Sequence, residues 1–165
     1  MANFAYSPMF PQTSDATEYE LVSSKHVQLV EFNGEPFLRV DPEALTLLAE
    51  RAFFDISHLL RSSHLAQLAD ILKDPEATKN DRFVALEMLK NAVISAEGLL
   101  PMCQDTGTAL ISAYRGDHVL VSGDDGEALS RGVYNTYKNH NLRYSQLSAQ
   151  TMFDEINTAT NLPAQ

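Results

Sequence analysis

Cysteine and basic residues are scarce in this chain of 165 residues, which contains one cysteine and 12 lysines and arginines. One cysteine forms no internal disulfide bond, so a reducing compartment, the cytoplasm, is the expected location. The 22 aspartates and glutamates give a net charge of −10, which disfavours binding to a phosphate backbone. No apolar run approaches the length of a membrane span, and the N-terminus lacks the features of a secretory signal. We therefore expect no nucleic-acid partner and no membrane partner.

The composition indicates a folded chain of about one domain. Hydrophobic residues make up 44% of the sequence, which is enough for a buried core and argues against intrinsic disorder. Residues 1–17 carry scattered aromatic, proline and hydroxyl side chains and predict an extended N-terminal arm, so that residues 18–165 form the domain. The run through Leu162 ends without a charged or glycine-rich tail, and we expect the chain to be cut from a longer one.

A β-hairpin is predicted near the N-terminus. Asn33-Gly34 separates two apolar-rich runs, at 26–32 and 35–40, and Asn-Gly in this setting is a strong hairpin signal. Pro36 predicts that the second strand lies at a sheet edge or begins there, because proline donates no ladder hydrogen bond.

Four helices are predicted from apolar residues at helical spacing. They span residues 42–60, 62–72, 80–97 and 125–140. Their expected N-caps are Asp41 for the first, Ser62 or Ser63 for the second, and Asp124 or Asp125 for the fourth, and Asn80-Asp81 starts the third. Gly98 suits the left-handed end of the third helix.

The remaining periodic runs are short. Residues 109–114 and 119–122 predict a second hairpin, residues 18–23 a further strand, and residues 152–156 one more helical turn. Helices and hairpins come in blocks rather than in βαβ alternation. The expected fold class is therefore α+β, helix-rich, with two β-hairpins.

The loop Pro101–Thr108 holds the only cysteine, Cys103, between the third predicted helix and the next apolar run. Loops between rigid elements commonly carry binding and catalytic groups. A cysteine nucleophile needs a nearby base, usually histidine, and the five histidines are dispersed along the sequence. A zinc site needs more Cys or His ligands, and an iron–sulfur cluster needs several more thiolates. Cys103 is therefore either a core residue or part of a site completed by another segment.

Two more candidates lie in this loop and near the C-terminus. The sequence Asp105-Thr106-Gly107 favours a turn. It is also the signature of aspartic proteases, which need two copies, and a homodimer could supply the second copy. Long helices precede it here, whereas that protease fold is almost all β. Arg143 follows a predicted helix end and could pair with a carboxylate through two N–H groups, or could be a surface residue beside that end.

The segment Leu100–Thr108 closely resembles the cluster-binding loop of class I, iron–sulfur-dependent fumarate hydratases, in their single-chain bacterial form. The resemblance covers nearly the whole chain and is specific in the run Cys-Gln-Asp-Thr-Gly-Thr. Further segments that resemble the family are 17–21, 42–51, 132–137, 141–145 and 157–165.

The resemblance implies a hydro-lyase of the tricarboxylic acid cycle, which adds water reversibly to fumarate to give (S)-malate. In this family three cysteines hold a 4Fe-4S cluster with one open iron, and the complete enzyme is expected to be a homodimer. By motif match, Cys103 is one metal ligand. Gln104 and Asp105 contact the substrate, Asp105 as the catalytic residue, and Arg143 clamps a substrate carboxylate.

The chain departs from the family in length, because the other two cysteine ligands and the general base lie beyond its last residue. We therefore expect an N-terminal fragment of a larger enzyme that is inactive without the remainder. Two alternatives stay open at this point. The related tartrate dehydratases share the cysteine loop, and a short chain could also be a stand-alone interaction module derived from such a domain.

Overall fold

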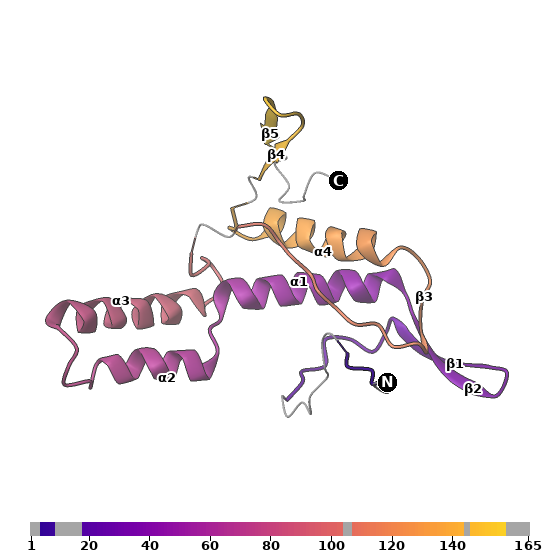
Figure 1. Ribbon diagram of the computed structural model, residues 1–165, viewed down its shortest axis with the longest axis horizontal. Helices are drawn as coiled ribbons and strands as arrows, with labels where there is room; N and C mark the ends of the chain where they lie inside the picture. The colour runs from indigo at the N-terminus through magenta and orange to yellow at the C-terminus, as the bar shows by residue number, and fades with distance from the viewer. Residues whose placement is uncertain (1–3, 9–17, 104–106, 144–145, 158–165) are drawn as a thin grey trace.

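The computed structural model describes residues 4–8, 18–103, 107–143 and 146–157, and it confirms a mixed α+β chain (Figure 1). Four helices and five strands are present in these ranges. In chain order they are β1 (Val27–Phe32), β2 (Glu35–Val40), α1 (Pro42–His58), α2 (Ser62–Ile71), α3 (Lys79–Ser95), β3 (Val119–Val121), α4 (Asp125–Asn139), β4 (Leu147–Ala149) and β5 (Glu155–Asn157). No helix among them is long and apolar enough to cross a bilayer.

The predicted N-terminal hairpin is confirmed. Strands β1 and β2 pair antiparallel around Asn33 and Gly34, whose φ angles of 53° and 82° are the left-handed values that a two-residue type I′ turn requires. Strand β2 is central rather than at an edge, because β3 pairs parallel with it from Leu38 onward. Pro36 lies at the start of β2, before the part that β3 joins, so its missing N–H interrupts no bond to β3.

Helices α1 and α4 lie side by side and run in the same direction away from this sheet (Figure 1). At their N-terminal ends the Ser122 hydroxyl donates to Asp41 Oδ1 at 3.2 Å. At their C-terminal ends the rings of Phe54 and His140 lie 4.7 Å apart. Each helix therefore follows one of two parallel strands, β2 or β3, and both end at the same side of the molecule.

The core lies between α1 and α4 at their C-terminal halves. Phe53 of α1 packs with Val133 and Tyr137 of α4 and with Leu142 beyond it, and Ala109 packs against this cluster. Full burial of a large apolar side chain stabilises a fold by about 1.5–3 kcal/mol. This cluster therefore fixes the segments at 109 and 142 to the two helices.

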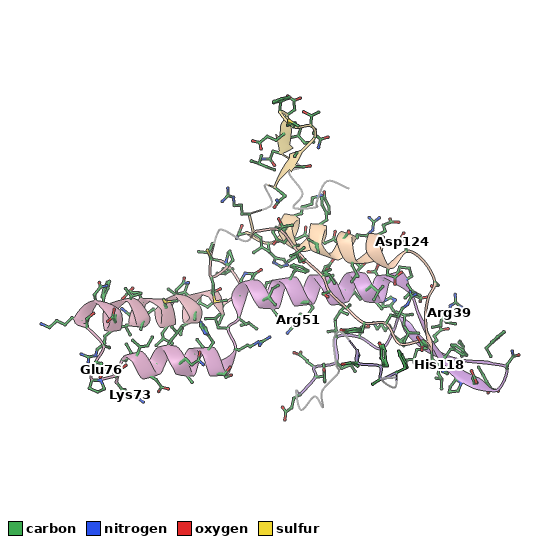
Figure 2. The ribbon with its side chains drawn as sticks, in the orientation of Figure 1. Arg39, Arg51, Lys73, Glu76, His118 and Asp124 are labelled. Atoms are coloured by element: carbon green, nitrogen blue, oxygen red, sulfur yellow. The ribbon has the colours of Figure 1, made fainter. Side chains whose placement is uncertain are left out.

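Helices α2 and α3 form a pair that extends beyond the end of α1, with Lys73 and Glu76 at the turn between them (Figures 1 and 2). Thr78 is the N-cap of α3. Its hydroxyl accepts a hydrogen bond from the Asp81 amide at 3.2 Å, and the Asp81 carboxylate accepts from the Thr78 amide at 2.8 Å. Hydrogen bonds from the Thr78 hydroxyl and amide lower the pKa of Asp81 below its ordinary value.

Two N-cap predictions are corrected in part. Asp41 precedes α1, and Pro42 opens the helix as predicted, but the Asp41 side chain makes no cap bond and accepts from Ser122 instead. Ser62 begins α2, and Arg61 occupies its N-cap position without a side-chain bond. Asp124 caps α4 as predicted, because it accepts from the Glu127 amide at 3.0 Å.

Three short elements were predicted wrongly. Residues 18–23 and 109–114 form no strand and pair with none of the five strands. The second hairpin is consequently absent from 109–122 and occurs instead as β4 and β5, at 147–157. This hairpin includes most of the segment 152–156 that was expected to be helical. Runs of three to six residues carry too little periodicity to separate a strand from a turn.

Candidate functional site

The carboxyl ends of α1, α3 and α4 meet beside the cysteine loop. The backbone amide of Met102 donates to the Ser57 carbonyl of α1 at 3.0 Å. The side chain of Asn141, just beyond α4, donates to the Leu99 carbonyl at 2.9 Å. Because helix carboxyl ends carry partial negative charge, this region favours cationic groups over anionic ones.

Cys103 is exposed at a pocket of ≈ 410 Å³. Phe53 and Tyr137 of the core form part of its wall, so the pocket is built directly on the α1–α4 contact. The other lining residues are Ile56, Ser57, Met102, Thr108, Ala109 and Leu110. The interpretation of Cys103 as a buried core residue is therefore wrong, and its thiol is accessible to a group outside this chain.

The arm that carries Arg143 is anchored at Asn141 and Leu142. Leu142 is buried in the core cluster with Phe53 and Tyr137, the two residues that also line the cysteine pocket. Asn141 binds the start of the cysteine loop, and Arg143 itself is exposed. The structure thus brings the segments of Cys103 and Arg143 to one end of the α1–α4 pair. Gln104 and Asp105 lie outside the described residues.

A stack of aromatic and imidazole rings lies at the end of α1. The Phe54 ring lies 4.3 Å from that of His58 and 4.7 Å from that of His140. His58 is 1% exposed, and its Nδ1 lies 2.8 Å from the Phe54 carbonyl oxygen. Gly98 has a φ of 76°, as predicted for the end of the third helix, and a Cβ there would lie 3.0 Å from Phe54 Cζ. This packing fixes the end of α3 against the end of α1.

Within the described ranges, no group of three or more histidine, cysteine, aspartate or glutamate side chains could hold a metal ion. Cys103 offers one exposed thiol, which suits one ligand of a centre whose other ligands come from elsewhere. The aspartic-protease alternative loses its support, because four helices make up most of the regular structure in the described ranges, whereas that protease fold is almost all β. Gly107 of that run has a left-handed φ of 62°, as a turn requires.

Sequence reasoning missed the residues that hold the loop. Asn91 of α3 donates to the Met102 carbonyl at 2.8 Å, and nothing in its position along the helix predicts this bond. Asn141 was noticed as a neighbour of Arg143, but its bond to Leu99 joins residues 42 positions apart. Ser57 acts through its backbone carbonyl, which carries no sequence signal.

Comparisons with known proteins find one family over most of the chain. The family model described as "Fumarate hydratase (Fumerase)" matches residues 46–165. "Fumarate hydratase class I, aerobic" of Salmonella typhimurium is 56% identical over 162 residues, which are 98% of this chain and 28% of that protein. The protein of the same description from Escherichia coli is also 56% identical, over 98% of this chain and 30% of its own length. "Fumarate hydratase 1, mitochondrial" of Leishmania major is 55% identical over 100% of this chain and 31% of its own length.

The chain therefore spans about three tenths of the length of these relatives. The identity extends from the hairpin and the helix pair through the cysteine loop to the Arg143 arm, because it covers 98% of the chain or more.

Proposed function

The chain belongs to the Fumarate hydratase (Fumerase) family, and on this premise we propose that it is the N-terminal part of a class I fumarate hydratase. The complete enzyme would add water reversibly to fumarate to give (S)-malate. The observation that carries this proposal is the 55–56% identity, over at least 98% of the chain, to proteins named fumarate hydratase.

Cys103 would ligate one iron of a 4Fe-4S cluster, and its exposure at the pocket supports this role. When bound, such a cluster would supply Lewis-acid polarisation of a substrate carboxylate and hydroxyl. Arg143 would hold a dicarboxylate through two parallel N–H bonds, a role that its position after a buried anchor supports. Gln104 and Asp105 would contact the substrate, with Asp105 as the catalytic residue, as the family motif implies.

The remainder of the enzyme is the proposed partner of the exposed apolar surface. On α3, Phe83 is 62%, Val93 70% and Ile94 55% exposed, and Leu29 of β1 is 74% exposed. Exposed apolar surface of this kind promotes association and is normally covered by other protein. The relatives are about three times longer than the part that matches, so they contain enough chain to cover this surface. We further propose that the complete enzyme is a homodimer.

Two finer points are also part of the proposal. We place the protein in the cytoplasm because one reduced cysteine suits that compartment, although a relative from Leishmania major is named as mitochondrial. We propose fumarate rather than tartrate as the substrate, because the three relatives described above are all named fumarate hydratase. The interaction-module alternative predicts instead that the complete natural protein binds no iron.

Substitution of Cys103 tests the proposal. In the complete protein, purified without oxygen, Cys103→Ser should abolish the visible absorption of the cluster and the hydration of fumarate, because the cluster loses one thiolate. Met102→Leu is the matched control. It conserves volume, and the Met102 backbone bonds remain, so iron content should stay at the wild-type value. Full activity in Cys103→Ser would remove Cys103 from the metal site and with it the proposed chemistry.

A further inference from the structure

Both backbone polar groups of Met102 are held by other elements. Its backbone amide donates to the Ser57 carbonyl of α1 at 3.0 Å. Its carbonyl accepts a hydrogen bond from the side-chain amide of Asn91 in α3 at 2.8 Å. The Met102 carbonyl lies in the same planar peptide unit as the N and Cα of Cys103. A bond to this oxygen therefore fixes the plane from which the Cys103 side chain projects.

A second asparagine, Asn141, binds the chain at Leu99, three residues before Met102. Asn141 donates from its side chain to the Leu99 carbonyl at 2.9 Å, and Pro101 stiffens the chain between the two bonds because its φ is fixed. Asn141 is two residues from Arg143 and precedes Leu142, which is buried in the core. The same amide thus ties the cysteine loop to the arm that carries Arg143.

The helix itself gains little from Asn91. Asparagine is among the poorer helix formers, and Asn91 is exposed in the last turns of α3. Alanine or lysine at this position would stabilise the helix more than asparagine does. Its bond to the loop is the structural reason for an amide there.

We propose that Asn91 and Asn141 are positioning residues that orient Cys103 and couple its loop to Arg143. Neither residue touches the reacting atoms. Each acts through a loop carbonyl, and the direction of Cys103 toward a metal centre depends on both. The inference rests on the proposed function only for what Cys103 binds, because the orientation of the loop is a property of this chain.

Hydrogen exchange in the complete protein, stripped of iron, tests the inference. In Asn91→Asp the donor becomes a carboxylate that repels the Met102 carbonyl, and exchange of the Met102 amide should accelerate about fivefold, the factor expected for loss of one net hydrogen bond. Asn141→Ala should accelerate exchange in the 99–103 peptide by a similar factor. The melting temperature should change little in either variant, because both residues are exposed.

Matched controls separate this effect from helix destabilisation. Asn80→Asp changes the same residue type near the start of α3, and Asn139→Ala does so at the end of α4. For neither side chain does the structure record a hydrogen bond within the described ranges, and both variants should keep wild-type exchange at Met102. Wild-type exchange in Asn91→Asp, or equal acceleration in Asn80→Asp, would overturn the inference.

Iron retention gives an independent readout on the loaded protein. Asn91→Asp should lose iron to EDTA several-fold faster than wild-type protein and Asn80→Asp, since a loosely held ligand leaves the metal more readily. If the wild-type protein binds no iron, the proposed function fails, and the exchange experiment still decides the role of Asn91. If iron is bound and lost at one rate in all three proteins, the positioning role is overturned.

Discussion

Arg143 stands directly after a buried residue, four residues beyond the last residue of α4. Leu142 is 4% exposed and fixes the backbone, while Arg143 is exposed at the same end of the α1–α4 pair as Cys103. The partial negative charge of the neighbouring helix ends favours a cation there. The Arg143 side chain is exposed and is not part of the buried core cluster.

Truncation of Arg143 should therefore affect catalysis and spare stability. In the complete enzyme, Arg143→Ala leaves a substrate carboxylate without its two donors, which should cost about 3 kcal/mol, or roughly 100-fold in kcat/KM. Steady-state kinetics and thermal melting check this expectation. Arg131→Ala is the control, because Arg131 is an exposed α4 residue paired with Glu127 and should change neither quantity. Near-normal kinetics with a large drop in melting temperature would assign Arg143 to the fold.

The role of a single residue was predictable where its amino-acid type alone favours a particular local structure. Asn33 and Gly34 adopt the left-handed turn that their types favour, and Asp124 caps its helix. Asn91 was not predictable, because its partner is a backbone carbonyl 11 residues away that the tertiary fold brings near. The role of an amide in positioning a loop is visible only once that loop is placed.

The contact between α1 and α4 depends on a glycine. A Cβ on Gly132 would lie 2.6 Å from the Ala49 Cβ and 3.1 Å from the Glu50 amide nitrogen, and it would also meet the Thr46 carbonyl oxygen. The backbones of α1 and α4 are therefore in close contact at Gly132. The side chain of Thr46 adds a hydrogen bond to the Ala128 carbonyl at 3.0 Å in the same interface.

Gly132→Ala should separate the two helices and destabilise the fold by about 3 kcal/mol, the upper range for an overpacked core. The better helix propensity of alanine offsets only about 1 kcal/mol of that cost. Urea unfolding followed by circular dichroism measures the change. Ser130→Ala, on the same helix and only partly buried, should stay within about 1 kcal/mol of wild type. An unchanged midpoint in Gly132→Ala would contradict the close packing of α1 on α4.

Long elements were predicted correctly and short ones were not, for a physical reason. Each of the four helices repeats its apolar residues over two or more turns, and all four are present close to the expected bounds. The run 109–114 is also rich in apolar residues, but it forms no strand, and only Val119–Val121 farther along the chain joins the sheet. Strand formation depends on a partner that the sequence of one segment does not specify.

At the scale of the whole molecule, the chain presents more apolar surface than an isolated domain usually does. Exposed large apolar residues occur on α1, on α3, on the N-terminal hairpin and at Leu99 and Leu100, just before the cysteine loop. Such surface promotes association unless other protein covers it. The chain also supplies one thiolate in all, whereas a four-iron cluster needs several. We therefore expect cluster assembly and catalysis only in the complete protein.

The most direct test compares two proteins in one assay. The 165-residue chain and the complete protein that contains it are reconstituted side by side, without oxygen, with iron and sulfide. Iron content, cluster absorption and fumarate hydration are then measured for both. The account predicts a four-iron cluster and (S)-malate formation in the complete protein, and neither in the 165-residue chain. Fumarate turnover by the short chain, or a complete protein that binds no iron, would contradict it.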